Sequence, residues 1–378
     1  MRKRHFTVAA SVVCGVGLIG AAWGPTASLV SASSPRVNAS TATSAKAFGG
    51  LAGLIKAAKK EGNLNVIALP PDWANYGAII ASFQKKYGIK INSANPDANS
   101  QDEIDAAVRL KGHDTAPDVF DLGTNVALKN TNLYARYKVL TWKDIPANVK
   151  AKNGKWYGDY GGYSSIGYNP DVVPAPKSIN DLLKPAYRGK VALNGDPTKA
   201  SAGFHGLMMA NIAEGGTATN LAPGVAFFHK LYQEGNFLKV DPTPATVQSG
   251  ATPVVIDWEY LNAGYAKEFA GKIKWKTLVP KNDVVGAFYD QSVNKDAPHP
   301  AAARLWEEYL YSNAGQVLWL KGLARPVRLA AMLKAHAGSK GLVAALPKVT
   351  GKPLVLKPSQ IVQDQSYLEQ NWSSAIGG

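Results

Sequence analysis

Short apolar runs alternate with amphipathic stretches in the first third of the chain. Three compact apolar runs are typical of buried strands and cover Asn65–Leu69, Ile89–Asn92 and Asp118–Leu122. Apolar residues recurring every three or four positions predict helices over Leu51–Glu61, Ala78–Tyr87 and Asp102–Lys111, with Ser100 as the N-cap of the last. Strands that alternate with helices at this spacing indicate parallel βαβ units.

The same alternation resumes beyond residue 190. The pattern predicts strands over Lys190–Asn194 and Pro253–Ile256, with helices over Gly203–Ala213 and Val225–Glu234 between them. Two further strands, Lys274–Pro280 and Val284–Asn294, are followed by a helix from Ala301 to Tyr311. Because 378 residues exceed what one ordinary hydrophobic core accommodates, two domains are expected.

The N-terminus has the layout of a secretory signal peptide. Arg2, Lys3 and Arg4 precede the apolar stretch Phe6–Trp23, and Val30-Ser31-Ala32 offers small residues for cleavage after Ala32. An uncleaved membrane anchor is the alternative, since the apolar stretch approaches spanning length. We therefore expect residues 1–32 to be a signal peptide and the Ser/Ala/Thr-rich residues 33–48 to be a flexible linker.

The single cysteine, Cys14, lies inside that apolar stretch. Val13 stands before it, where a lipoprotein signal carries a small residue, so lipid attachment is not expected. After cleavage the protein would contain no disulfide and no thiolate metal site.

The formal net charge is +15, and +12 remains for residues 33–378 because Arg2, Lys3 and Arg4 precede them. Such a charge could favour nucleic acid or an anionic surface. The basic residues are scattered among acids, with no run longer than Lys59-Lys60 or Lys85-Lys86 after the N-terminus. This pattern favours a solvated basic surface, and no nucleic-acid partner is predicted.

An aromatic, Gly-rich stretch connects the two halves. Trp156–Tyr168 reads as an extended run, Asn169-Pro170 forms a turn, and Ser178 with Asp181 three residues later marks a short helix. The segment resembles the first interdomain crossover of two-crossover periplasmic solute-binding proteins. The resemblance rests on Pro176, Ser178, Asp181-Leu182-Leu183, Pro185, Tyr187 and Gly189-Lys190-Val191, and on the later motifs Lys295–Pro300, Ser312–Gln316 and Ala324–Arg328.

The resemblance implies an α/β fold of two lobes, each a mainly parallel sheet flanked by helices, with the ligand in the cleft between them. It places residues 49–160 plus 283–313 in the first lobe and 161–282 plus 314–378 in the second. It further implies an exported monomer on the periplasmic or extracytoplasmic face of the membrane. This monomer would capture a small-molecule solute for ABC transporter permease subunits, without a cofactor, a metal or a catalytic residue.

Candidate ligand-binding residues follow from one rule: in open parallel sheets, ligands bind beyond the carboxyl ends of the strands. Segments at those ends and in the crossover supply the candidates, which are Asp72, Trp73, Tyr76, Ser100, Asn125, Asp159, Tyr160, Tyr163, Asp196, Thr198, Ser201, Asp257, Trp258, Tyr260 and Tyr289. Their carboxylates and aromatic rings suit a compact solute with positive charge. Each also has a structural interpretation: Trp73 and Tyr76 could pack in the core, and Asp196 could cap a helix.

The ligand remains open among several classes. An organic cation such as a polyamine or thiamine is the first expectation, since Asp72–Tyr76 resembles the polyamine-type loop and Asp159–Tyr163 the thiamine-type crossover. Ferric iron and 2-aminoethylphosphonate are alternatives of the same fold. The iron-binding subgroup carries an adjacent Tyr-Tyr pair where this chain has Trp258-Glu259-Tyr260, and an anionic group could bind at the helix N-terminus near Thr198.

A secreted hydrolase and a nonspecific surface adhesin are the two other classes of function to consider. A secreted hydrolase finds little support, since the six histidines lack metal-ligand spacing and Gly162–Gly167 is one residue too long for a nucleophile elbow. His205 with apolar neighbours is typical of a packed histidine. A nonspecific surface adhesin would need only positive charge, and salt-dependent binding to polyanions would identify it.

Overall fold

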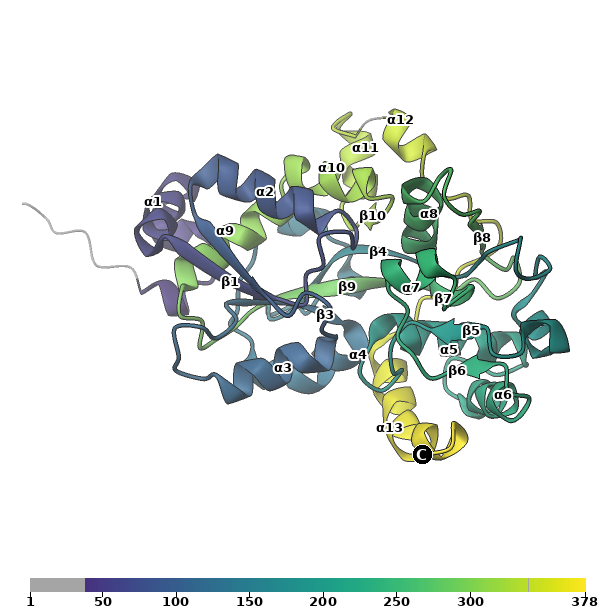
Figure 1. The fold of residues 1–378 in the computed structure, drawn as a ribbon. Coiled ribbons are helices and arrows are strands. Elements are labelled where there is room, and N and C mark those ends of the chain that lie inside the picture. The colour runs from purple at the N-terminus through teal and green to yellow at the C-terminus, as the bar shows by residue number, and fades with distance from the viewer. Residues whose placement is uncertain (1–37, 339) are drawn as a thin grey trace, which may run out of the picture. The chain divides into compact units, whose positions relative to one another are not determined.

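The computed structural model describes residues 38–338 and 340–378 (Figure 1). The predicted signal peptide and the first five residues of the predicted linker lie outside the described residues. Residues 38–48 do not form the expected flexible linker: they contain two 3-10 helices, η1 (Ala39–Thr41) and η2 (Ala45–Phe48). The buried Arg304 donates hydrogen bonds to the carbonyls of Ser40 and Ala42, both at 2.7 Å, and so fixes this segment against a helix 260 residues away.

The first βαβ units form close to where the apolar pattern predicts them. The elements are α1 (Leu51–Glu61), β1 (Asn63–Ile67), α2 (Tyr76–Tyr87), β2 (Lys90–Ala94), α3 (Ser100–Arg109), β3 (Val119–Gly123) and α4 (Thr124–Ala127). The N-cap of α3 is Asn99 rather than Ser100, because the Asn99 side chain accepts hydrogen bonds from the Gln101 and Asp102 amides. Ser100 Oγ accepts instead from the amide of Gly123.

The crossover forms one long strand, β4 (Tyr157–Tyr168), which pairs with β7, β8, β9 and β10. Its register against β9 shifts between Gly158 and Gly161, so Asp159 and Tyr160 lie in a bulge. A Cβ on Gly161 would lie 2.0 Å from the carbonyl oxygen of Ala287, which explains why glycine is needed at this close approach.

The remaining helices and strands first complete the second half of the fold, and the last of them pack again beside the elements of the first half. They are β5 (Val191–Leu193), α5 (Ser201–Ala213), α6 (Ala222–Gln233), β6 (Phe237–Leu238), α7 (Pro244–Ser249), β7 (Val254–Trp258), α8 (Glu259–Glu268), β8 (Lys276–Leu278), β9 (Gly286–Val293), α9 (Pro300–Leu310), α10 (Asn313–Lys321), β10 (Arg325–Pro326), α11 (Leu329–Lys334), α12 (Lys340–Ala344) and α13 (Pro358–Ala375). Short 3-10 helices lie on either side of β4. They are η3 (Leu128–Leu133), η4 (Trp142–Asp144) and η5 (Ala147–Val149) between α4 and β4, and η6 (Ile179–Leu183) and η7 (Pro185–Tyr187) between β4 and β5. The helix expected after Ser178 is therefore the 3-10 helix η6.

The sheets are mixed rather than mainly parallel. A two-stranded sheet pairs β1 with β2, and a larger sheet has the order β3-β9-β4-β7-β5-β6, with β8 and β10 also pairing with β4. Parallel ladders join β1 to β2, β5 to β6 and β5 to β7. All the ladders of β4 and β9 are antiparallel. The two crossover strands thus add antiparallel pairing to an otherwise parallel pattern, and Figure 1 shows them running between the two groups of helices.

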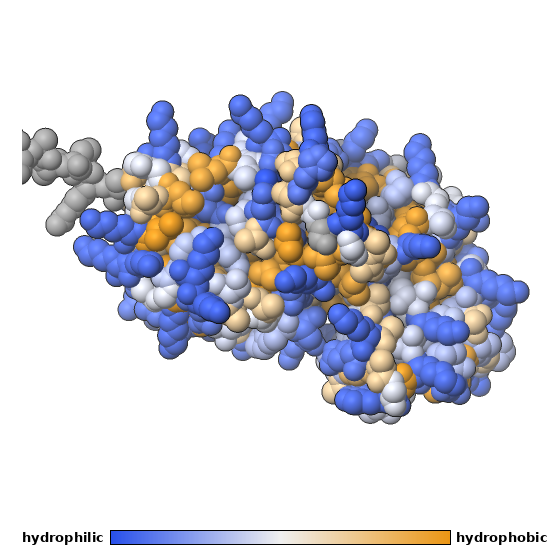
Figure 2. All heavy atoms as spheres, turned by 90° about the horizontal axis from the view of Figure 1, so that it is seen from above, coloured by the Kyte–Doolittle hydropathy of each residue, from blue (hydrophilic) through white to orange (hydrophobic). Residues whose placement is uncertain are grey.

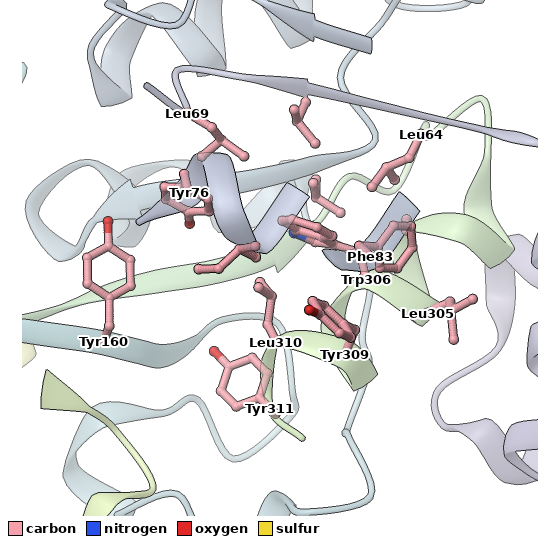
Figure 3. Packing of buried hydrophobic residues seen from close by; sticks show 14 of the residues in the cluster. Leu64, Leu69, Tyr76, Phe83, Tyr160, Leu305, Trp306, Tyr309, Leu310 and Tyr311 are labelled. Carbon is pink, nitrogen blue, oxygen red and sulfur yellow. The ribbon is translucent and has the colours of Figure 1, made fainter. Parts of the chain in front are cut away.

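Two large hydrophobic clusters lie on either side of the crossover strands. The first gathers side chains from α1, β1, α2 and α9, where Phe83 packs against Trp306 and Tyr309 at 5.2 and 5.5 Å between ring centroids (Figure 3). The second gathers α5, α6, β5 and β7 together with the C-terminal helix α13, which packs against α6 and α4. Figure 2 shows hydrophilic side chains projecting from the face seen from above, with apolar residues in patches between them.

The boundary expected between lobes at residue 313 does not match these clusters. Helix α10 belongs to the first cluster, because Trp319 stacks on Tyr160 at 4.2 Å and meets Tyr76 edge-on at 4.9 Å between ring centroids. The C-terminal helix, by contrast, completes the second cluster through Leu368 and Trp372. The chain therefore crosses between the clusters again after residue 327.

The packing of α1 gives a direct test of the first cluster. Leu54 is fully buried and Leu51, one turn earlier, is exposed. We expect Leu54→Ala to lower the free energy of unfolding by about 2–5 kcal/mol, because it removes buried methyl groups and leaves a cavity. Leu51→Ala is the matched control and should change the free energy of unfolding by no more than about 0.5 kcal/mol. Urea unfolding measures both, and equal effects would contradict the described packing.

Candidate functional site

A cavity of about 320 Å³ opens at the carboxyl end of β1 and at the start of α5. The loop after β1, the start of α3, the loop before α7 and one face of α8 form most of its wall. The residues used below are Asp72, Trp73, Asp97, Ser100, Glu103, Asp121, Ala200, Ser201, Ala202, Asp241, Tyr260, Lys267, Glu268, Tyr289 and Lys321. Its size suits a compact small molecule.

Three aromatic side chains form one wall of the cavity. The Trp73 ring lies edge-on to Tyr260 and Tyr289, with centroids 6.3 and 5.9 Å away. The Trp73 indole N–H donates to the Tyr160 hydroxyl at 2.8 Å, and the Trp258 indole N–H donates to the Tyr289 hydroxyl at 3.2 Å. Rings held in this way present fixed faces to a ligand, and such faces attract cations.

The acid at the inner end of the cavity is Asp121, near the carboxyl end of β3. Its Oδ2 accepts hydrogen bonds from the hydroxyls of Tyr76 at 2.7 Å and Tyr160 at 3.1 Å. Its Oδ1 is buried and has no hydrogen-bond partner among the described residues. Burial raises the pKa of Asp121 to about 7, against the lowering effect of the hydrogen bonds from Tyr76 and Tyr160 and of the nearby side-chain amide of Gln291.

A second buried acid, Glu103 of α3, lies beside Asp121. Its Oε2 accepts a hydrogen bond from the Asp121 amide at 2.9 Å. Burial, and then the charge of Asp121, raise the pKa of Glu103 well above its usual range.

Acids outnumber bases in the cavity wall. Six acidic side chains line it (Asp72, Asp97, Glu103, Asp121, Asp241 and Glu268), against two lysines, Lys267 and Lys321. Both lysines and four of the acids are exposed, whereas Glu103 and Asp121 are buried. This local excess of acid stands in a chain whose formal net charge is +15. The cavity is thus suited to a ligand with positive charge.

Six of the fifteen residues predicted from the sequence line this cavity: Asp72, Trp73, Ser100, Ser201, Tyr260 and Tyr289. They come from five separate elements or loops, and the fold brings them together. Their contact with a ligand remains a prediction.

The other nine predicted residues are not in the cavity wall: Tyr76, Asn125, Asp159, Tyr160, Tyr163, Asp196, Thr198, Asp257 and Trp258. Tyr76 and Tyr160 lie behind it, where they donate to Asp121. Asp159 accepts from Gln291 Nε2 at 2.9 Å. These side chains support the cavity wall from behind.

The carboxyl end of β7 is more deeply buried than its sequence indicates. Asp257 accepts from Asn194 Nδ2 at 2.8 Å, and burial raises its pKa to about 7. Trp258 is stacked behind Tyr260, with ring centroids 6.3 Å apart, and is 1% exposed. Of these three residues, Tyr260 alone lines the cavity.

Four of the predicted residues outside the cavity wall make structural contacts: Tyr163, Asp196, Thr198 and Asn125. The Tyr163 amide donates to Glu259, which is also ion-paired with Arg325, whose guanidinium lies 4.8 Å from the centre of the Tyr163 ring. Asp196 Oδ1 accepts from the amide and hydroxyl of Thr198, so this pair forms a turn before α5. Asn125 Nδ2 donates to Gln365 on α13, at 3.4 Å.

Helix α5 begins at the cavity without a side-chain cap. Its N-cap is Ala200, and Ala200, Ser201 and Ala202 all line the cavity. The first amides of a helix attract anions. An anionic group of a ligand could therefore be accommodated at this end.

The sequence analysis missed five of the six acids of the cavity: Asp97, Glu103, Asp121, Asp241 and Glu268. The signal for Asp121 was present, since it interrupts the apolar strand Val119–Gly123 near its carboxyl end, where ligands of parallel sheets bind. Glu103 and Asp241 resemble ordinary surface acids in sequence.

No group of three or more His, Cys, Asp or Glu side chains that could hold a metal ion occurs among residues 38–338 and 340–378. In the same part of the chain, no helix combines the length and the apolar character needed to cross a bilayer.

Solved structures of periplasmic binding proteins share this α/β fold. The periplasmic binding protein P5PA is 17% identical, with 83% of this chain and 99% of that chain covered and a TM-score of 0.66. Iron-bound HitA from Pseudomonas aeruginosa is 20% identical, with coverages of 83% and 99% and a TM-score of 0.60. AfuA from Actinobacillus pleuropneumoniae, with bound fructose-6-phosphate, is 17% identical, with coverages of 83% and 98% and a TM-score of 0.63. At these identities the likeness shows the fold alone.

The family model described as bacterial extracellular solute-binding protein matches residues 115–344, more than half of the chain. The chain belongs to this family, as the crossover motifs led us to expect. It is therefore a solute-binding protein of ABC transport and not an enzyme.

Buried carboxylates predict a stability that depends on pH. Burial raises the pKa of Asp290 to about 8 and that of Asp364 to about 7, whereas unfolded aspartates titrate near 4. The folded protein then holds protons that the unfolded chain has lost. The stabilisation that these groups provide is fully present below about pH 4 and is lost as the pH rises through 7 and 8. The free energy of unfolding should therefore decrease as the pH rises over this range.

The variant Asp364→Asn isolates this contribution, since it removes one titrating group from α13. We expect its stability relative to the wild type to rise between pH 4 and pH 8 in urea unfolding. Asp105→Asn, at an exposed position of α3, is the control and should leave the difference constant. If the stability difference between Asp364→Asn and the wild type also stays constant with pH, the buried environment assigned to Asp364 is wrong.

Proposed function

We propose that this protein captures a small cationic solute outside the cytoplasmic membrane and delivers it to the permease of an ATP-driven importer. The observation that carries the proposal is a cavity wall that combines six carboxylates with the rings of Trp73, Tyr260 and Tyr289. Carboxylates pair with cations and aromatic faces attract them, so both kinds of group favour the same ligand charge.

An organic cation is the first candidate. Asp121 lines the cavity and its Oδ1 is buried without a partner among the described residues, so the positive charge of an ammonium group bound in the cavity would stabilise the carboxylate. The rings of Trp73 and Tyr260 would cover the carbon skeleton of such a solute. A polyamine and thiamine both fit this description.

Ferric iron is the second candidate, and the solved structures favour it over a polyamine or thiamine. One structure is iron-bound, and others are ferric ion-binding proteins from Pasteurella haemolytica and Campylobacter jejuni. The hydroxyl of Tyr260 and Oδ1 of Asp121 are both buried without a partner among the described residues, and such oxygens suit Fe(III). Against iron, Trp258 replaces one member of the expected tyrosine pair.

2-Aminoethylphosphonate is a further alternative of the same fold. Its ammonium would pair with the acids of the cavity, and its phosphonate would lie at the uncapped start of α5.

A thermal-shift screen tests the proposal and separates these ligands. The panel contains spermidine, putrescine, thiamine, 2-aminoethylphosphonate and Fe(III)-citrate. At a hundredfold excess over its dissociation constant, a ligand adds about 2.7 kcal/mol to the stability of the folded state. A raised midpoint with an organic cation supports the first candidate, and a shift with Fe(III)-citrate alone replaces it with iron. The absence of a shift with every member of the panel would overturn the proposed cationic cargo.

Substitution of Trp73 tests the aromatic wall. We expect Trp73→Ala to weaken binding of an organic cation by about 0.5–2 kcal/mol, because a desolvated cation loses one ring face. Trp142→Ala is the matched control, since that half-buried ring lies outside the cavity and contacts Lys150. Isothermal titration calorimetry measures both, and equal effects would contradict the role of Trp73.

Substitution of Tyr260 distinguishes iron from an organic cation. Tyr260→Phe keeps the ring and removes only the hydroxyl. Iron bound by the phenolate would give a visible charge-transfer band, and this variant should lose it. An organic cation stacked on the ring should keep most of its affinity. Retention of an iron band in Tyr260→Phe would exclude Tyr260 as a ligand of the metal.

A further inference from the structure

The C-terminal helix α13 contacts both halves of the fold, the first built around β1 to β3 and the second around α5 and α6. On the second half it packs against α6 and β6, where Trp372 meets the rings of Phe228 and Phe237 edge-on, with centroids 5.4 and 6.3 Å apart. It also contacts α4 and η3, which continue the chain from β3 in the first half. Figure 1 shows α13 (yellow) crossing below α4 and α5. One helix therefore joins the two halves that together line the cavity.

Gln365 is the residue of α13 that bridges the halves, and it is 1% exposed. Its Nε2 donates to the carbonyl of Thr198 at 2.6 Å, in the turn before α5. Its Oε1 accepts from Asn125 Nδ2 of α4 at 3.4 Å. Thr198 shortly precedes Ser201, which lines the cavity from the second half. Asn125 shortly follows Asp121, which lines it from the first. A single buried amide thus connects the segments that carry a cavity residue of each half.

A second contact with the first half lies one turn further along α13. Glu369 forms an ion pair with Lys129 of η3, and the two side chains are 51% and 32% exposed. An ion pair this accessible to solvent is screened by salt and shifts an equilibrium by up to about fivefold. Leu128, next to Lys129, packs against the second hydrophobic cluster and also against the residues around β3.

The helix is attached more firmly to the second half than to the first. Apolar side chains of α13 are buried in the second hydrophobic cluster: Ile361, Leu368, Trp372 and Ala375. The contacts with α4 and η3 described above are a long amide hydrogen bond, an exposed ion pair and one half-buried leucine. Because buried apolar area stabilises more than such polar contacts, α13 should remain with the second half when the two halves separate.

The two halves also touch directly near this bridge. Gly123, at the end of β3, lies against Ser201 at the start of α5, where a Cβ on Gly123 would lie 2.4 Å from the Cβ of Ser201. Only glycine permits so close an approach. Separation of the halves at this point would lengthen the contact between Gly123 and Ser201 and the bridge through Gln365 together.

We propose that α13 is a latch that holds the two sides of the cavity at the spacing seen here, with Gln365 as its positioning residue. The ion pair between Lys129 and Glu369 is the part that releases. Domains of periplasmic binding proteins close around ligands by hinge motion, and the latch favours the closed arrangement before a solute arrives. A solute then binds a larger population of competent molecules. This inference goes beyond the proposed function and does not depend on the charge of the solute.

Distances measured in the solute-free protein test the latch. Residues 33–378 contain no cysteine, so spin labels can be attached at Val108→Cys on α3 and Gln233→Cys on α6, both exposed positions. Double electron–electron resonance gives the distribution of distances between the labels. We expect Glu369→Lys, which replaces attraction by repulsion, to raise the ratio of longer to shorter distances by up to about fivefold. Addition of Gln365→Ala should raise it to about tenfold.

Reversal of both charges provides a rescue. Lys129→Glu combined with Glu369→Lys restores an ion pair, and the distance distribution should return to that of the labelled parent. Asp171→Lys is the matched control for Glu369→Lys, because its ion pair with Lys274 lies within the second half. It should leave the distribution unchanged.

Gln363→Ala is the matched control for Gln365→Ala. Gln363 also belongs to α13, but its Nε2 donates to the carbonyl of Thr219 at 3.2 Å, within the second half. It should leave the distances as they are in the parent. Urea unfolding separates a latch from a general role in stability, since Glu369→Lys should shift the distances and keep the unfolding midpoint of Asp171→Lys.

An unchanged distribution in Glu369→Lys and in its combination with Gln365→Ala would overturn the latch. So would a double charge reversal that fails to restore the distances, because the pair would then not be their cause. If Gln365→Ala does not fold, Glu369→Lys and its rescue still decide. No solute is used in these measurements, so a thermal-shift panel without any binder would overturn the cationic cargo and leave the test of the latch intact.

Discussion

The pairing of one strand, β4, with four others is the constraint on which the rest of the structure depends. Ladders to β9 and β10 tie it to the first hydrophobic cluster, and ladders to β7 and β8 tie it to the second. The bulge at Asp159 and Tyr160 then turns the Tyr160 ring between Trp319 and Tyr289, with centroids at 4.2 and 5.3 Å. The hydroxyl of the same ring reaches Asp121, so one irregularity in one strand positions the inner end of the cavity.

The buried acids in and near the cavity lower the stability of the folded protein. Asp121, Glu103 and Asp290 are buried acids whose pKa values are raised by burial, and the described residues around them offer hydroxyls and amides rather than basic side chains. A core made only for stability would place apolar residues at these positions. Two of these acids, Asp121 and Glu103, line the cavity and are part of the basis for the proposed cationic cargo.

Much of the fold could be predicted from the sequence, and less of the site. Apolar periodicity located α1 and the strands near β1, β3 and β7, because local patterns determine which face is buried. The Arg304 contacts that order residues 38–48 join positions 262 and 264 residues apart, so no local pattern reveals them. Asp257 and Trp258 were predicted to contact the ligand at a strand end, yet the strand is buried along its whole length and, of this segment's three predicted residues, Tyr260 alone reaches the cavity. Asp121 was missed because an acid within an apolar strand was taken as part of the strand.

The C-terminal helix α13 has a consequence for the order in which the protein folds. It supplies Leu368 and Trp372 to the second hydrophobic cluster, whose other members come from residues 166–285 and from the segment just before the helix. During synthesis this core lacks one wall until α13 has emerged from the ribosome. The second cluster can therefore close only after residues 358–375 have been made, although most of its other members are complete by residue 285.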